Sequence, residues 1–362
     1  MATLKLQTLT CPSCTRQISK YRPFETTVVC PSCGTLIKNP MVDSKDVPTP
    51  ERIIPFTSDE ETFERTMVNS LVNQNYCDKN VFDGINTDNV FKAYLPMYLF
   101  EGTFNSSWSC ESSFEDQQVD ISNNWTDSGK TISTKKVKKW RPQNGTATGN
   151  FAFLCLANED SKGLPEELRK FTYLFPYDVM CSKAFDPTLL EDKGNLVTIP
   201  QNADATIVWQ KHGKDMVDQT AQEAALNQIG NQEIRNFRAS SSYSLTTKGT
   251  YVLAPFWFVY YNYKNQQYHF LMDGLGQRTS YSYPVDQEDV DFYNQKEKVK
   301  KIVGWLWVLT LVMWYLFNFT TAFVTLIVWI VAKIVVNKKM NKEIEEMLQA
   351  GRDQRQAGAS RL

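Results

Sequence analysis

The chain has 362 residues, 42% of them hydrophobic, and a formal net charge of −1. This length has room for more than one domain. The charge is unevenly distributed, because residues 1–40 and 296–362 are basic whereas residues 41–295 carry 34 acidic and 23 basic side chains. The acidic central region argues against nucleic-acid binding there, since phosphates require a basic surface.

The first 38 residues contain two Cys-Pro-Ser-Cys segments with fifteen residues between them. Four thiolates on two tight turns can surround a metal ion tetrahedrally, and a unit this small has almost no core. Metal binding must therefore supply most of its folding free energy. We predict a small β zinc ribbon over residues 1–38 that holds a structural Zn²⁺ ion through Cys11, Cys14, Cys30 and Cys33.

Other interpretations of the ribbon stay open. A rubredoxin-like iron centre uses the same four ligands, and two disulfides would form only in an oxidising compartment. Some ribbon residues could contact a nucleic acid backbone, stack on bases or touch a partner protein, although a solvated basic face is the simpler interpretation. These residues are Arg16, Lys20, Tyr21 and Arg22.

Residues 39–56 contain four prolines and are predicted to form an extended linker. Residues 57–295 are predicted to form an α+β body with mainly antiparallel strands. Its first helix begins at a capping box made by Ser58 and Glu61. A second helix is predicted over residues 215–237.

Strands are predicted from about Ala93 onward. Residues 94–100 and 251–261 share a layout of apolar residues, a proline and aromatic residues, which suggests an internal pseudo-repeat. Residues 268–272 complete a hairpin with the second copy. Residues 131–141 and 150–157 flank a loop rich in Gly, Asn and Thr and are predicted to form another hairpin.

A cluster of lysines lies within the acidic body. Such a cluster can rest on lipid headgroups, or it can be a solvated hairpin edge whose lysines block aggregation. Its members are Lys135, Lys136, Lys138 and Lys139.

The sequence contains no signature of an enzyme. It has no Walker loop and no GxGxxG, HExxH or GxSxG motif, and it has only two histidines. The remaining cysteines are scattered without ligand spacing and are predicted to be buried thiols. We therefore predict that the protein is not an enzyme.

An apolar run from Ile302 to Val336 contains no charge before Lys333. As one helix its uncharged part would be roughly 46 Å long, against a hydrocarbon core of about 30 Å. A polar and aromatic spot near its middle and basic flanks on both sides favour two crossings. We predict a transmembrane helical hairpin over residues 296–339 and a cytosolic tail helix over residues 340–362. One long tilted helix is the alternative.

The chain resembles a family of bacterial membrane proteins with an N-terminal TFIIB-type or rubredoxin-like zinc ribbon. Thr15 stands where relatives usually have glycine. The resemblance implies partners such as membrane-stress or flotillin-like assemblies. It rests on the two Cys-Pro-Ser-Cys segments, the strands 94–100 and 253–258, the segment Phe175-Pro176-Tyr177-Asp178, the turn Asp273-Gly274 and the terminal apolar run.

The sequence thus predicts a multi-domain protein with a zinc ribbon, an α+β body and a C-terminal transmembrane hairpin. We expect it to be integral to the cell membrane, with most of the chain in the cytoplasm. The predicted function is a scaffold or adaptor that contacts lipid and docks unidentified protein partners, and self-association is compatible with that role. A membrane-tethered nucleic-acid-binding protein that uses the basic ribbon is the alternative, although nucleic acid is not the expected partner.

Overall fold

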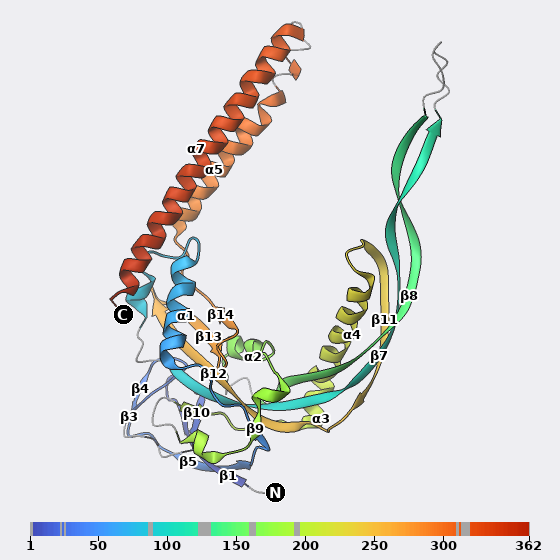
Figure 1. Cartoon of the computed structure of the whole chain (residues 1–362). Helices are drawn as coiled ribbons and strands as arrows, with labels where there is room; N and C mark the ends of the chain where they lie inside the picture. The colour runs from blue at the N-terminus through green and yellow to red at the C-terminus, as the bar shows by residue number, and fades with distance from the viewer. Residues whose placement is uncertain are drawn as a thin grey trace.

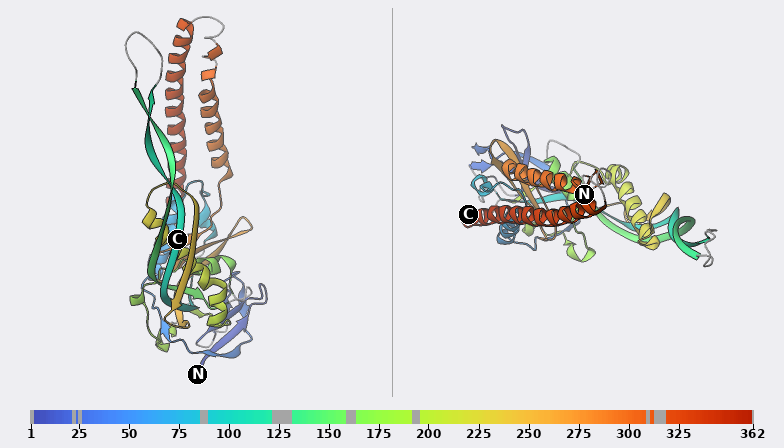
Figure 2. Two further views of the ribbon diagram at one scale, coloured as in Figure 1. Left: turned by 90° about the vertical axis from the view of Figure 1, so that its right-hand side faces the viewer. Right: turned by 90° about the horizontal axis from the view of Figure 1, so that it is seen from above.

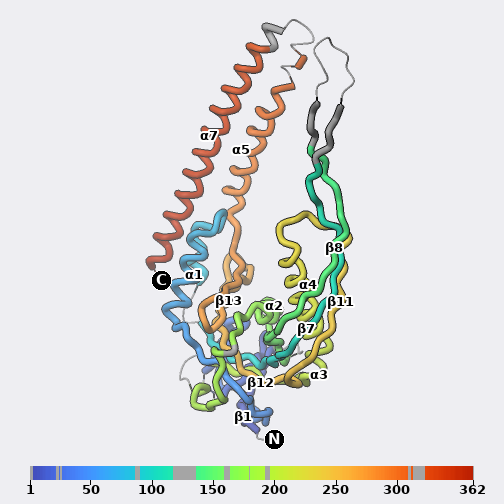
Figure 3. Tube along the Cα trace, turned by 45° about the vertical axis from the view of Figure 1, so that its right-hand side comes forward, coloured from blue at the N-terminus to red at the C-terminus, as the bar shows by residue number. Residues whose placement is uncertain are grey.

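The computed structural model describes residues 3–21, 24, 27–85, 90–121, 132–158, 164–191, 196–308, 311–312 and 319–361. Figure 1 shows three parts: a body that contains the N-terminus, a hairpin of two long helices, and a curved arm of strands with α4 on its inner side. The arm and the helical hairpin leave the body in the same general direction (Figures 1 and 3).

The N-terminal segment folds into two small sheets. β1 (Thr3–Thr10) lies between β2 (Gln17–Lys20) and β5 (Asp43–Pro48), and both neighbours are antiparallel to it. β3 (Thr27–Val29) pairs with β4 (Leu36–Lys38), also antiparallel. Each Cys-Pro-Ser-Cys segment therefore forms the turn of one hairpin, as a ribbon requires.

Residues 39–56 are extended, as predicted, but they are not a free linker. β5 belongs to the ribbon sheet, and β6 (Arg52–Ile53) pairs with β12 (Thr250–Tyr263) and with β9 (Lys183–Ala184). The linker prediction is wrong because two sheets use the backbone donors and acceptors of this segment. One buried cluster accordingly joins ribbon to body, with Leu9, Ile18 and Ile37 beside Leu95, Leu168 and Phe256.

The body is built on a nine-stranded, mainly antiparallel sheet. Its main path is β10–β7–β12–β13–β14, and β8 and β11 also pair with β7. Only the pairs β10–β7 and β6–β12 are parallel among the described strands. The α+β prediction with mainly antiparallel strands is confirmed. The remaining strands are β7 (Phe91–Ile121), β8 (Ile132–Leu156), β10 (Leu196–Thr198), β11 (Ile234–Leu245), β13 (Gln266–Asp273) and β14 (Thr279–Tyr281).

The two similar segments at residues 94–100 and 251–261 are neighbours in the sheet. They pair antiparallel, with Tyr94 opposite Pro255 and Pro96 opposite Leu253. Both are buried almost throughout, and strands buried on both faces read as continuous apolar runs. This shared environment accounts for their similar composition. The predicted hairpin of the second segment with residues 268–272 is confirmed as β12–β13.

The arm corrects two sequence predictions. The segments predicted at residues 131–141 and 150–157 do not form a hairpin with each other, because residues 132–141 and 150–156 lie on one strand, β8, which pairs with β7 from Met97 to Ile121. The Gly/Asn/Thr stretch stays extended because Gly145 and Gly149 leave space for the rings of Trp108 and Phe104. The helix predicted to reach residue 237 ends as α4 (Lys214–Ile229), since Gly230 has φ +73°, and the chain continues into β11.

The two longer helices of the body each bury one apolar face. α1 (Glu60–Asn73) buries Phe63, Met67 and Leu71, and α4 packs against the arm. A turn of π-helix, Trp209–Gly213, joins α3 (Ala205–Val208) to α4. The other short helices are α2 (Glu166–Thr172) and the 3₁₀ turns Val81–Gly84, Val179–Cys181 and Pro187–Leu190.

The C-terminal part forms two long helices, α5 (Gln287–Trp305) and α7 (Phe319–Ala359). Figure 2 shows them side by side from two directions. Lys296 pairs with Glu343 near the body, and Trp329 donates to the Val303 carbonyl at 2.8 Å farther out, so the helices run antiparallel. Within the described ranges, which omit residues 309–310 and 313–318, no helix has the length and apolarity needed to cross a membrane. The predicted tail helix over residues 340–362 is a continuation of α7.

Candidate metal centre

The two Cys-Pro-Ser-Cys turns are built in the same way. In the first turn the amide of Thr15 donates to the Cys11 carbonyl, and in the second the amide of Gly34 donates to the Cys30 carbonyl, each at 2.9 Å. In both turns the first cysteine's amide also donates to the carbonyl five residues ahead, again at 2.9 Å. These paired hydrogen bonds direct both thiols of each turn to one side.

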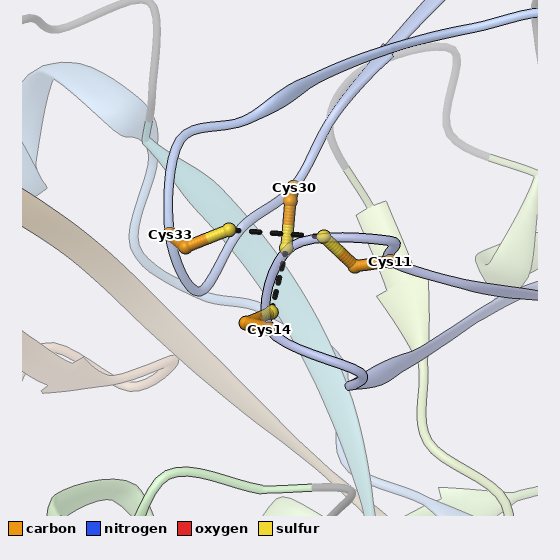
Figure 4. A group of neighbouring side chains, drawn as sticks. All are labelled: Cys11, Cys14, Cys30 and Cys33. Atoms are coloured by element: carbon orange, nitrogen blue, oxygen red, sulfur yellow. Dashed lines mark hydrogen bonds between the residues drawn. The ribbon is translucent and has the colours of Figure 1, made fainter.

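The four thiols converge on one point between the hairpins (Figure 4). The sulfur atoms of Cys11 and Cys33 are 3.7 Å apart, as are those of Cys14 and Cys30, and all four lie within 4.8 Å of one another. A tetrahedral site with metal–sulfur bonds of about 2.3 Å has sulfur–sulfur edges of about 3.8 Å. The four cysteines can therefore hold a metal ion without a large rearrangement. All four are free thiols.

The surroundings of the thiols differ. Burial raises the pKa of the Cys30 and Cys14 thiols. Burial works against ionisation of Cys33 too, but hydrogen bonds with Thr35 and with neighbouring thiols lower its pKa to about 7. Thr35 Oγ1 lies 3.2 Å from Cys33 Sγ. Because metal binding requires thiolates, Thr35 favours the ionised form at one ligand, a role that the sequence pattern did not indicate.

The centre is fixed to the body as well as to the ribbon. Cys11 and Cys30 are almost fully buried, and Gln267 of β13 donates to the Ser32 carbonyl at 2.9 Å. The second turn is thus tied to the β12–β13 hairpin, more than two hundred residues away in sequence. Closed four-sulfur sites have no open coordination position, so this arrangement can organise structure but cannot present a metal-bound substrate.

The predicted contact residues of the ribbon do not form one exposed patch in the described part of the chain. Tyr21 packs against the core, and Phe24, three residues farther along the chain, is also partly buried. Lys20 lies over the Phe24 ring, 5.9 Å from its centroid. Arg16 is half-buried, and Arg22 lies outside the described residues.

The lysine cluster lies on β8 in the outer part of the arm. Acidic side chains pair with its described members: Lys136 with Glu115, Lys138 with Glu233 and Lys139 with Asp116. The side chain of Lys135 is outside the described part. Cross-strand partners neutralise these lysines, which agrees with the interpretation as a solvated hairpin edge.

Comparison with protein-family models, with curated proteins and with solved structures finds no match to this chain. The assignment of the site therefore depends on the geometry described above.

Proposed function

We propose that the protein is a scaffold that is anchored in the cell membrane by its C-terminal helical hairpin, carries a structural zinc ion in its ribbon and docks protein partners on its cytoplasmic body. The observation that carries this proposal is the exposed apolar surface of the hairpin's outer half. An exposed apolar surface of this kind marks a site of contact with lipid or another molecule, and lipid fits its composition.

The apolar side chains gather on α5 and α7 away from the body. Large exposed ones occur on both helices, and their exposed fractions reach 63% at Ile302, 70% at Trp305 and 61% at Val328. The halves near the body are charged and linked by Lys296 and Glu343. This division along both helices is the one expected of a hairpin that enters a bilayer from one side.

The basic flanks support the predicted topology. Because α5 and α7 run antiparallel, the lysines at residues 296–301 and 338–342 lie at the same end of the hairpin. The positive-inside rule places such an end in the cytoplasm. The ribbon and the body would then share that compartment, where thiols stay reduced and available for metal.

Zinc is the metal that fits the donor set best. Four cysteine thiolates at tetrahedral spacing suit structural zinc, and the same set also holds iron. Mass spectrometry of the purified chain is expected to give one zinc per chain. Its absorption spectrum is expected to show no visible band. Finding iron with a reversible redox couple would instead assign electron transfer to this centre.

The anchor can be tested by fractionation of cells that express the full chain. We expect the protein to stay with membranes after alkaline carbonate extraction and to be released by detergent. Val328→Asp combined with Val331→Asp should abolish this behaviour, because each aspartate costs roughly 3 kcal/mol near the centre of a bilayer. Glu345→Gln combined with Glu346→Gln, on the charged half, is the control and should stay membrane-bound. A wild-type chain that is monomeric and soluble without detergent would refute the proposal.

The scaffold role predicts stable co-purification of a protein partner from mild detergent extract. Multivalent attachment to a membrane raises the local concentration of whatever the body binds. Recovery of monomer alone after gentle crosslinking would contradict this role.

Nucleic-acid binding through the ribbon is supported less well, because Tyr21 and Phe24 pack inward. Salt-dependent DNA or RNA binding that disappears on charge reversal at Arg16 and Lys20 would favour it instead.

A further inference from the structure

A cleft of about 770 Å³ opens where the ribbon meets the body. Four segments that are far apart in the sequence line it: the end of β5 with the residues after it, the first third of β7, α3 with the residues before it, and the start of β12 with the residues before it. Figure 1 places β5 and α3 at the end of the body that is farthest from the outer half of the helical hairpin. A neighbouring cavity of about 390 Å³ shares Glu51 with the cleft and adds Glu101.

Two buried tyrosines form the base of the cleft. The rings of Tyr98 and Tyr251 lie 6.0 Å apart between centroids, and each residue is 6% exposed. Tyr98 donates to the Ala203 carbonyl at 3.1 Å and accepts a hydrogen bond from Gln201. These bonds fix the position of the Tyr98 ring, and the burial of both rings leaves the base preformed before any ligand arrives.

Two exposed carboxylates stand above this base. Asp204 occupies the N-cap position of α3, but its side chain makes no capping hydrogen bond. Aspartate at an N-cap normally accepts from the helix amides, and a local rule broken without a compensating contact often marks a functional position. Glu51 accepts a long hydrogen bond from the Tyr251 amide at 3.3 Å. Among the described residues neither carboxylate has a salt-bridge partner.

The two carboxylates act on the same phenol. Burial raises the pKa of Tyr98, and the charge of Asp204 and, less strongly, that of Glu51 raise it further. Both carboxylates line the same cleft as the Tyr98 ring. Lys248 also lines the cleft. Arg52, which lines the neighbouring cavity, already donates to Ser182 at 2.9 and 2.8 Å.

We propose that this cleft binds a lysine or arginine side chain presented by an extended segment of a partner protein. The carboxylates supply charge-assisted hydrogen bonds, and the tyrosines and Pro50 supply a rigid apolar base for the aliphatic stem. The proposal rests on the proposed scaffold function and specifies where the partner docks. A lipid amine is disfavoured as the ligand, because β5 and α3, which line the cleft, lie at the end of the body opposite to the part of the hairpin assigned to the bilayer (Figure 1).

Fluorescence anisotropy with the full chain in mild detergent tests the site. The probe is a fluorescein-labelled peptide of alternating glycine and arginine, and a glycine–glutamate peptide is the negative control. We expect Glu51→Gln combined with Asp204→Asn to weaken binding of the basic peptide about tenfold, since two charged contacts are lost. Lys248→Gln should strengthen binding, because it removes the opposing charge.

A charge-matched variant separates this site from general attraction to an acidic body. Glu60→Gln combined with Glu61→Gln removes the same charge from the exposed first turn of α1 and should leave affinity unchanged. Equal weakening by both double variants, or no weakening by either, would overturn the proposal. Because the assay needs no membrane, its failure would leave the anchoring test unaffected, and anchoring could fail while the peptide still binds.

Discussion

The residue that follows the second cysteine differs between the two Cys-Pro-Ser-Cys turns, and its backbone conformation shows why the difference matters. Thr15 and Gly34 occupy equivalent positions after the second cysteine of each turn, and both have positive φ, +58° and +70°. Glycine adopts this conformation at no steric cost, whereas a β-branched residue is strained there. The first turn therefore carries backbone strain that the second turn does not.

Replacing Thr15 with glycine is expected to stabilise the metal-loaded ribbon by about 1 kcal/mol, because the strain disappears. Loss of the Thr15 hydroxyl bond to the Cys14 carbonyl at 2.7 Å offsets part of the gain. The measurement is the midpoint of metal release in a chelator titration. Gly34→Thr is the mirror control and should shift that midpoint in the opposite direction. Equal midpoints for all three proteins would contradict the strain argument.

His269 is half-buried on β13, where its Nδ1 lies 3.1 Å from the Ser282 hydroxyl. Burial lowers the pKa of its imidazole below the usual 6.5, although the more distant charge of Glu167 opposes this. The unfolded chain therefore binds a proton at a higher pH than the folded chain does. The neutral His269 side chain therefore stabilises the fold fully above about pH 6.5. This stabilisation is lost as the pH falls toward the pKa that His269 has in the folded chain.

Urea denaturation between pH 7 and pH 5.5 should show this loss in the wild type. In His269→Gln the pH dependence should be smaller, because the titrating group is gone. A slope that is the same in the wild type and in His269→Gln would assign the pH dependence to other groups.

At the scale of elements, a buried arginine of α7 connects that helix to the end of α1 and to the loop that follows it. Arg355 of α7 is 2% exposed, and its guanidinium donates to the carbonyls of Val72, Gln74 and Cys77 at 2.7 to 3.1 Å. Two of these carbonyls belong to the C-terminal end of α1 and its cap, where helices have no internal donors left. Lys79 bridges Asp286 and Asp289 at the start of α5 close by. The base of the hairpin is thereby fixed to the body.

Arg355→Met should destabilise this junction by about 3 kcal/mol, because several buried carbonyls lose their donor. Hydrogen exchange is expected to accelerate at the end of α1 and in the last turns of α7. Arg352→Met, which removes one long contact to Asn75 at 3.4 Å, is the control and should change little. Unchanged exchange in Arg355→Met would show that the junction does not depend on this side chain.

Local signals predicted the position of elements better than their limits. The start of α1 was predicted at a Ser58 capping box, yet Asp59 is the N-cap and accepts from Thr62 at 2.9 Å. Ser58 instead contacts Gly274 and Trp257, which are distant in sequence. The sequence predicts two strands where the structure has the single long strand β8. Two glycines that normally signal a turn here make room for rings on β7. In each case a tertiary contact overrode a local preference.

At the scale of the whole molecule, insertion of the hairpin in a bilayer restricts where the arm can lie. Both extend from the body in the same direction (Figure 3). The outer arm carries charged pairs on β7 and β8, and such groups are excluded from hydrocarbon. A bilayer around the outer half of α5 and α7 therefore requires the arm to turn away from the hairpin relative to the arrangement in Figure 1.

This change can be measured in lipid vesicles with spectroscopic reporters at two exposed positions, Thr146 on the arm and Val328 on α7. The separation should exceed that in the present structure, because the arm must remain in water. A second pair within the arm, Thr146 and Ser240, should keep its separation. A membrane-bound chain with both separations unchanged would contradict the movement.

The sequence alone determined the four clustered cysteines, the antiparallel α+β body and the apolar C-terminal run, because each depends on local spacing or on composition. The structure decided that the proline-rich segment belongs to two sheets, that α7 continues to a buried Arg355, and that Glu51, Tyr98, Asp204 and Tyr251 share one cleft. These features arise from contacts between residues far apart in the chain. Their energies come from burial and hydrogen bonding that exist only after the chain has folded, and a pattern of neighbouring residues contains no record of them.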